Sequence, residues 1–217
     1  MHNESSVVIP VRHSEGRLYV IQNGQRIWLT KLSSGTSDFA HSPLGRIANV
    51  TKAVSEKLQG IVIPAGQTFS FNAAMGPSID GRSGWSNSLV IVNGKDLVEA
   101  PGGGICQAAT TTLRAAVLAG LPIEKRANHS LYVTYYEKHG VGLDATVFPG
   151  KQDFTFVNDM EHDIYVIGHV EGTVATVDMY GIPDGRSVSV TGPFLSTTTA
   201  VPTQVPPLHA NEIAWVQ

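Results

Sequence analysis

The sequence has a single cysteine, Cys106, among its 217 residues. One thiol excludes an internal disulfide, so the fold depends on its hydrophobic core, and the thiol serves either packing or chemistry. Charged residues are also scarce, at 15% of the chain, with a formal net charge of −3. Without a block of lysines or arginines, the sequence does not have the pattern of a protein that binds nucleic acid or an anionic membrane surface.

Long hydrophobic runs are missing too. No segment approaches the roughly 18 apolar residues that a membrane span needs, and the polar residues 1–6 are not typical of a signal peptide. We therefore expect no membrane-spanning segment in this chain. Spacings such as Cys-x-x-Cys and His-x-x-x-His are absent from the sequence, so we expect neither a metal site nor a cofactor.

Hydrophobic residues make up 42% of the chain, enough for one folded domain with a sizeable core. Helices are predicted at about residues 43–59 and 106–119, because apolar residues recur there at helical spacing and a glycine follows each segment. Short β-prone runs, among them residues 130–136 and 144–148, are typical of antiparallel strands. The sequence therefore predicts an α+β fold with a mainly antiparallel β-sheet and two principal helices.

Three regions are expected along the chain. Residues 1–35 hold two β-prone runs near an Asn-Gly pair and predict an N-terminal β-hairpin segment. Residues 33–41, rich in serine and glycine, are predicted to connect it to a main domain at residues 36–182. Residues 183–217 are expected to form a strand and then a tail rich in threonine and proline.

Cys106 follows three glycines at the predicted start of the second helix. The positive end of a helix dipole lowers a thiol pKa from its usual value of about 8.5, which favours the nucleophilic thiolate. Glycines leave the backbone open to an acyl group, and the N–H groups of Gly103, Gly104 and Gln107 are the predicted oxyanion donors. The alternative is that Cys106 is a small buried hydrophobic residue and that the glycines only form a tight turn.

A cysteine nucleophile usually works with an imidazole and a third group that orients the ring. Among eight histidines, His129 stands where a strand is predicted to begin, after the helix of Cys106 has ended. From there it can point back at the start of that helix. Asp144 opens the next predicted strand, so we hypothesise a Cys106, His129 and Asp144 arrangement. The alternative is that His129 and Asp144 are ordinary turn or strand-end residues.

Several separated motifs occur along the chain. They are Arg46-x-x-Asn49, Pro64-x-Gly66-x-x-Phe69-Ser70-Phe71-Asn72, Gly76-Pro77, GGGICQAATTTLRAAVLAGLPI from Gly102 to Ile123, Arg126-x-x-His129-Ser130, Asp144-Ala145-Thr146-Val147 and Asp153-Phe154-x-Phe156-x-Asn158. With these motifs the chain resembles the VanW domain from about Thr36 to Gly181. The string around Cys106 is the most diagnostic part.

This resemblance implies a bacterial cell-envelope, extracytoplasmic setting. VanW proteins were named for their association with glycopeptide-resistance clusters, and members of the family have been identified as L,D-transpeptidases that use a cysteine. The resemblance implies that Cys106 is the nucleophile, with His129 and Asp144 as its partners. It also makes Arg46 and Asn72 candidate substrate-binding residues and peptidoglycan stem peptides the expected partners. An exported enzyme should have an export or anchoring segment, so we expect either that the chain is part of a longer protein or that it has no role in the envelope.

Three functions stay open from the sequence. The first is a transpeptidase, which passes an acyl group from Cys106 to an amine. The second is a cysteine amidase or L,D-carboxypeptidase, in which water accepts that group. The third is a non-catalytic cell-wall binding protein, in which the glycine loop forms a peptide groove and Cys106 is unreactive.

Overall fold

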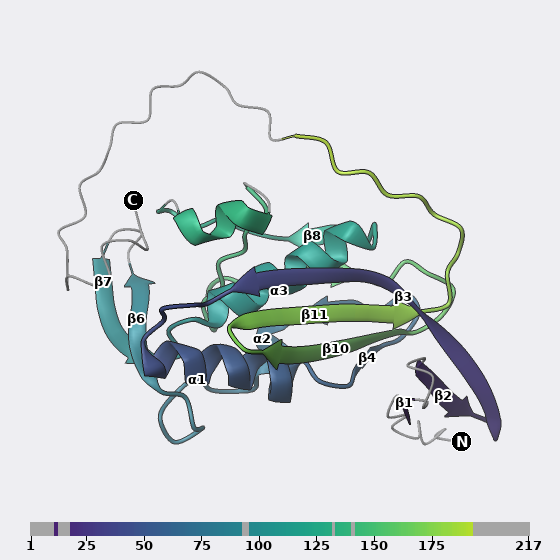
Figure 1. Cartoon of the computed structure of the whole chain (residues 1–217), viewed down its shortest axis with the longest axis horizontal. Helices are drawn as coiled ribbons and strands as arrows, with labels where there is room; N and C mark the ends of the chain where they lie inside the picture. The colour runs from purple at the N-terminus through teal and green to yellow at the C-terminus, as the bar shows by residue number, and fades with distance from the viewer. Residues whose placement is uncertain (1–10, 13–17, 93–95, 132, 140–141, 193–217) are drawn as a thin grey trace.

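The structure is a computed structural model, and it describes residues 11–12, 18–92, 96–131, 133–139 and 142–192. The predicted Thr/Pro-rich tail lies outside the described residues. Within them the chain forms antiparallel sheets together with helices, so the α+β prediction is confirmed (Figure 1). Residues 183–192 contain no strand, and the rest of the segment 183–217, in which a strand was predicted, lies outside the described residues.

The largest sheet has six strands in the order β1-β2-β3-β11-β10-β4, and all neighbours are antiparallel. Their bounds are Val11–Arg12 (β1), Leu18–Gln22 (β2), Gln25–Asp38 (β3), Ile61–Ile63 (β4), Ile164–Glu171 (β10) and Val174–Gly181 (β11). The predicted N-terminal hairpin is formed by β2 and β3. Strand β3 then continues through residue 35 into the main sheet, so residues 33–38 are strand where the sequence predicted a connection.

Helices cover one face of this sheet. Helix α1 (Leu44–Lys52) runs directly into a π-helical turn, η1 (Ala53–Lys57), and α3 spans Ile105–Leu118. These elements confirm the two predicted helices. Helix α3 lies against β3 and β11, and η1 lies against β10 (Figure 1). The close approach of the helices to the sheet requires glycine at two positions. A Cβ on Gly35 would overlap the carbonyl oxygen of Thr111, and a Cβ on Gly168 would overlap the carbonyl oxygen of Val54.

Two smaller sheets complete the fold. One has the order β5-β9-β8, from Thr68–Ser70 (β5), Thr155–Val157 (β9) and Ile123–Lys125 (β8). A short helix, α2 (Phe71–Met75), follows β5 and is capped by the Ser70 hydroxyl, which accepts from the Ala73 N–H at 3.1 Å. The other sheet is a hairpin of β6 (Asn87–Val92) and β7 (Asp96–Pro101), at the opposite end of the molecule from β1 and β2 (Figure 1).

Two predicted strands are absent. Residues 130–136 do not pair as a strand, and a 3₁₀ helix, η2 (Thr134–His139), lies there instead. Residues 144–147 are also outside any strand. Side chains of α3, instead of neighbouring strands, form hydrogen bonds with the backbone of these two segments. Thr110 Oγ1 accepts from the Ala145 N–H at 3.0 Å, and the buried Arg114 donates to the carbonyl oxygen of Tyr136 at 2.9 Å. Period-two patterning does not reveal such side-chain contacts, so the sequence overpredicted strands here.

Candidate functional site

The glycine turn before α3 is fixed by conformation and by close packing. Gly102 and Gly104 have φ values of +88° and +107°, in the region that favours glycine. A Cβ on Gly103 would lie 2.6 Å from the Leu89 carbonyl oxygen of β6, and a Cβ on Gly104 would lie 3.0 Å from Cγ of Arg46 in α1. The turn therefore places Cys106 in the first turn of α3, at the junction with β6 and α1.

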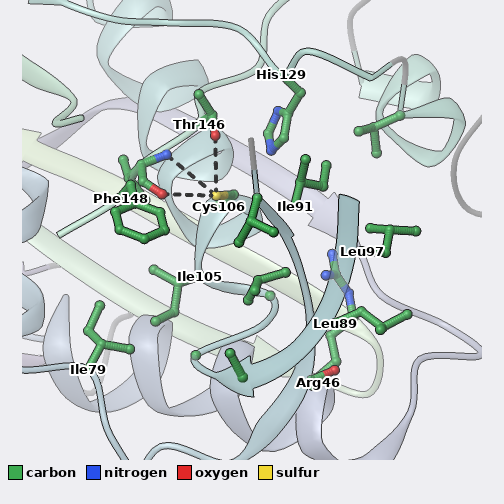
Figure 2. A pocket seen from close by; sticks show the side chains of 18 of the residues that line it. Arg46, Ile79, Leu89, Ile91, Leu97, Ile105, Cys106, His129, Thr146 and Phe148 are labelled. Carbon is green, nitrogen blue, oxygen red and sulfur yellow. Dashed lines mark hydrogen bonds between the residues drawn. The ribbon is translucent and has the colours of Figure 1, made fainter. Parts of the chain in front are cut away.

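A cavity of about 650 Å³ opens beside Cys106. Its walls come from the β6–β7 hairpin, the glycine turn and the segments around residues 128–136 and 146–149. Most lining side chains are apolar, including Ile79, Leu89, Ile91, Leu97, Ile105 and Phe148 (Figure 2). Arg46 and His129 are the basic side chains among the described lining residues, and no acidic side chain is among them.

The Cys106 sulfur is half-buried and contacts the segment that contains residues 146 and 147. It accepts a hydrogen bond from the Val147 N–H at 3.4 Å and lies 3.5 Å from the carbonyl oxygen of the same residue. Thr146 Oγ1 lies 3.7 Å away (Figure 2). A donated N–H stabilises a thiolate more than a neutral thiol, so this segment favours the reactive form of the cysteine.

His129 and Asp144 form a close pair next to this cysteine. The ring nitrogen Nδ1 of His129 lies 2.7 Å from Asp144 Oδ2, which also accepts from the backbone N–H of His129 at 2.8 Å. Arg126 holds the Asp144 backbone by donating to its carbonyl oxygen at 2.7 Å. The ring of His129 points into the cavity toward Cys106 (Figure 2). Figure 2 draws no hydrogen bond between the His129 ring and the Cys106 sulfur. The expected approach of a His129 ring nitrogen to within about 4 Å of this sulfur therefore stays a prediction.

Burial and mutual interaction shift the pKa values of all three groups. Burial raises the pKa of Cys106, but the interaction with His129 and the contacts to Val147 and Thr146 outweigh it, and the pKa is lowered. Burial lowers the pKa of His129, whereas Asp144 and Cys106 raise it to about 9. Burial raises the pKa of Asp144, but the hydrogen bonds from His129 and the charge of Arg126 lower it overall. The arrangement therefore favours a thiolate and an imidazolium at neutral pH.

Two of the predicted oxyanion donors lie elsewhere. The side chain of Gln107 is buried outside the cavity, where it accepts from Arg46 at 2.6 Å and donates to the Asp38 carbonyl oxygen at 2.9 Å. The backbone N–H of Gln107 donates to the Gly104 carbonyl oxygen at 2.9 Å. Gly103 packs on β6 and does not line the cavity within the described chain. Of these three predicted donors, Gly104 borders the cavity in the described chain, whereas Gln107 and Gly103 pack in the turn.

The two predicted substrate-binding residues are also separated. Arg46 lines the cavity from α1. Asn72 does not, because its side chain donates to the Gln152 carbonyl oxygen at 2.9 Å and its backbone N–H donates to Asp153 at 2.9 Å. It supports the loop that carries Gln152, which itself lines the cavity. Asn72 thus supports this loop, and its predicted contact with substrate stays a prediction.

Three residues near the site were not assigned roles from the sequence. Thr146 and Val147 contact the sulfur, and both belong to a motif quoted above for its aspartate. Arg114 is buried and donates to the carbonyl oxygens of Leu143 at 3.1 Å, Thr36 at 2.8 Å and Tyr136. An arginine in an otherwise uncharged helix was the available signal, since a buried arginine needs several acceptors.

Two kinds of site are not found in the part of the chain that the structure describes. No cluster of three or more histidine, cysteine, aspartate or glutamate side chains is arranged to hold a metal ion there. No helix among these residues has the length and apolar character needed to cross a membrane.

Comparison with known proteins gives the family of the chain. Residues 45–180 match the family described as VanW like protein. The chain belongs to the VanW family. The uncharacterized protein YoaR of Bacillus subtilis (strain 168) is 33% identical over 142 residues, which cover 65% of this VanW chain and 45% of the relative. The chain thus spans less than half of that relative's length, and no solved structure matches it.

Proposed function

We propose that this VanW protein is a peptidoglycan L,D-transpeptidase of the bacterial cell envelope, with Cys106 as its nucleophile. The observation that carries the proposal is the grouping of a thiol of lowered pKa with the His129–Asp144 pair at one cavity. A nucleophile, a base within the same cavity and a carboxylate that orients the base are the parts that acyl transfer through a cysteine needs.

In the first half-reaction, the Cys106 thiolate attacks the carbonyl carbon of the third residue of a stem peptide. The tetrahedral intermediate collapses as the bond to the terminal D-residue breaks, and His129 gives its proton to the leaving amine. A thioester on Cys106 results. The pKa of about 9 keeps His129 protonated at neutral pH before the attack, and Asp144 holds the ring.

In the second half-reaction, the side-chain amine of another stem attacks the thioester. His129 takes a proton from this amine, the carbon–sulfur bond breaks, and the thiolate is regenerated with a new peptide bond between two third-position residues. The Val147 N–H and the Thr146 hydroxyl, which contact the sulfur of the free enzyme, are the donors best placed to stabilise the oxyanion once the sulfur is acylated.

The charge of the cavity supports an acidic peptide as the substrate. Arg46 and His129 line it, and no acidic side chain is among its described lining residues. Stem peptides carry free carboxylates, so an arginine at the wall provides an ion-pair partner. Most of the remaining wall is apolar, and in this mechanism it limits the access of water to the thioester, which favours transfer to an amine over hydrolysis.

A product assay with a disaccharide tetrapeptide tests this function. Wild type is expected to release the terminal D-residue and form a dimer cross-linked between third-position residues, and Cys106→Ala is expected to form neither product. His129→Ala should slow the release by about 10²-fold or more, whereas His162→Ala, which changes an exposed histidine outside the cavity, should retain wild-type rates.

The products also separate the alternatives. Free tripeptide without dimer would indicate an L,D-carboxypeptidase, with water as the acceptor. Equal binding of the peptide by wild type and Cys106→Ala, without any product, would indicate a non-catalytic cell-wall binding protein.

A further inference from the structure

One edge of the β6–β7 hairpin faces the cavity. The hairpin is a two-stranded sheet within the described residues, so each strand has an edge that no other strand covers. Five consecutive residues of β6, 88–92, line the cavity. Side chains alternate between the two faces of a strand, so a run of five consecutive lining residues indicates that the backbone of β6 borders the cavity as well as its side chains.

The hydrogen-bond register identifies which backbone groups lie on that edge. The Gly102 N–H donates to the Ser86 carbonyl oxygen at 3.1 Å, and the register pairs residue 87 with 101 and residue 91 with 97. Hydrogen-bonded and non-bonded pairs alternate in an antiparallel ladder. Ser86 belongs to a bonded pair, so Ile91 belongs to a non-bonded pair and directs its N–H and C=O away from β7.

The packing around the base of the hairpin agrees with this assignment. The carbonyl oxygen of Asn87, which has the same parity as Ile91, lies against Gly45 of α1, and the carbonyl oxygens of both Ser88 and Leu89 lie against Gly103 of the glycine turn. Beyond Leu89 the edge continues past the glycine turn into the cavity. In the described part of the chain, no hydrogen bond is made to the outward N–H or C=O of Ile91.

We propose that this edge of β6 binds the acyl-donor peptide as an added, extended strand, with one peptide residue exchanging two backbone hydrogen bonds with Ile91. An extended peptide is the ligand whose own N–H and C=O groups match such an edge. Leu89, Ile91 and Leu97 then supply apolar contacts for alternate side chains (Figure 2). A peptide held here lies beside Cys106, which opens into the same cavity. The proposal rests on the proposed function and states how its donor binds.

Proline substitution tests the edge with little change to the hairpin. Ile91→Pro removes the outward N–H but no hydrogen bond to β7, and proline is tolerated where the N–H of an edge strand faces outward. Ile91→Ala separates the loss of the side chain from the loss of the N–H. Glu99→Pro is the matched control, because Glu99 pairs with Leu89 and directs its N–H to the far edge of β7, outside the cavity.

Binding is measured by calorimetry in the Cys106→Ala background, with the tetrapeptide L-Ala-γ-D-Glu-meso-diaminopimelate-D-Ala as the probe. Ile91→Pro is expected to weaken binding by about tenfold, from the loss of the one backbone hydrogen bond that the Ile91 N–H donates. Ile91→Ala should weaken it less, and Glu99→Pro should leave it unchanged. If Ile91→Pro does not fold, tetrapeptides N-methylated at one amide at a time replace it, and one of them should lose affinity by a similar factor.

Three results would overturn the proposal. The first is that Ile91→Pro and Glu99→Pro change the affinity for the tetrapeptide equally. The second is that every N-methylated peptide binds with full affinity. The third is that wild type sediments as a dimer and that Ile91→Pro dissociates this dimer. The dimer would mean that a second copy of the chain occupies the edge. Because binding is measured without the nucleophile, a difference between the two proline variants stands even if wild type never forms a thioester. The subsite and the proposed reaction can therefore fail separately.

Discussion

Asp144 binds His129 through both its backbone and its ring, with one carboxylate oxygen 2.8 Å from the backbone nitrogen and 2.7 Å from Nδ1. The double contact fixes the ring orientation and leaves Nε2 as the nitrogen available to the cavity. A carboxylate in this position also stabilises the protonated ring, in agreement with the raised pKa of His129. The orientation and the charge of the imidazole thus depend on the same side chain.

Replacing Asp144 by asparagine should lower the pKa of His129 from about 9 toward the ordinary value of 6.5. The amide keeps the shape of the side chain but removes its negative charge. Imidazole resonances followed by NMR across pH give the pKa directly. Asp184→Asn, which removes a carboxylate bound to Arg186 instead, is the control and should leave His129 unchanged. An unchanged titration in Asp144→Asn would mean that Asp144 does not control the ring.

The raised pKa of His129 also predicts how stability depends on pH. A group whose pKa is higher in the folded state adds stability that is fully present below its unfolded pKa, about 6.5. This contribution is lost as the pH rises through the folded value of about 9. The free energy of unfolding should therefore be compared by urea titration between Cys106→Ala and Cys106→Ala/His129→Gln, so that no thiol titrates over the same range, and the first should show an advantage that declines between about pH 6.5 and 9. An advantage that grows over this range would contradict the assigned direction of the shift.

The sequence predicted the candidate catalytic residues better than the residues that hold them in place. The sequence indicated three residues that the fold brings together. The glycine triplet indicated Cys106, and the positions after the helix indicated His129 and Asp144. Gln107 and Asn72 do not line the cavity, because adjacency in sequence does not say which way a side chain points. Gln107 lies one residue after the cysteine and therefore points to a different face of α3.

Thr146 was identified only from the structure, and its contact with the sulfur can be tested without substrate. Thr146→Val removes the hydroxyl but keeps the side-chain shape, so the pKa of Cys106 should rise. The pH profile of iodoacetamide alkylation should move to higher pH, with labelling at pH 7 slower by a few-fold. Thr146→Ser restores a hydroxyl and should recover the wild-type profile. Identical profiles for all three proteins would show that the hydroxyl does not act on the thiol.

The fold was predictable where patterning is strong and less so where small residues dominate. Helices α1 and α3 followed from apolar spacing, whereas the serine- and glycine-rich end of β3 resembled a loop in sequence. It is a strand because it lies under α3. Ser33 donates to the Ala115 carbonyl oxygen at 2.7 Å, and Gly35 lies against Thr111. Only small side chains fit there, which local propensity does not indicate.

Gly35→Ala should therefore destabilise the protein strongly, because the added Cβ overlaps backbone atoms of α3 that cannot move independently. We expect a loss of on the order of 2–4 kcal/mol in the free energy of unfolding. Gly81→Ala is the matched control, since a Cβ there has nothing within 4 Å, and it should change stability by less than about 1 kcal/mol. Urea titration of both variants measures the difference. Equal stabilities would contradict the close packing of α3 on β3.

Intact-protein mass spectrometry of wild type incubated with the stem tetrapeptide tests the central claim, that Cys106 is an acylated nucleophile. The account predicts a transient mass increase equal to the tripeptide acyl group, located on Cys106 after proteolysis and removed when an acceptor amine is added. Cys106→Ala should show no increase. If wild type binds the tetrapeptide but never gains this mass, or gains it on a residue other than Cys106, the account of the site as a cysteine acyltransferase is contradicted.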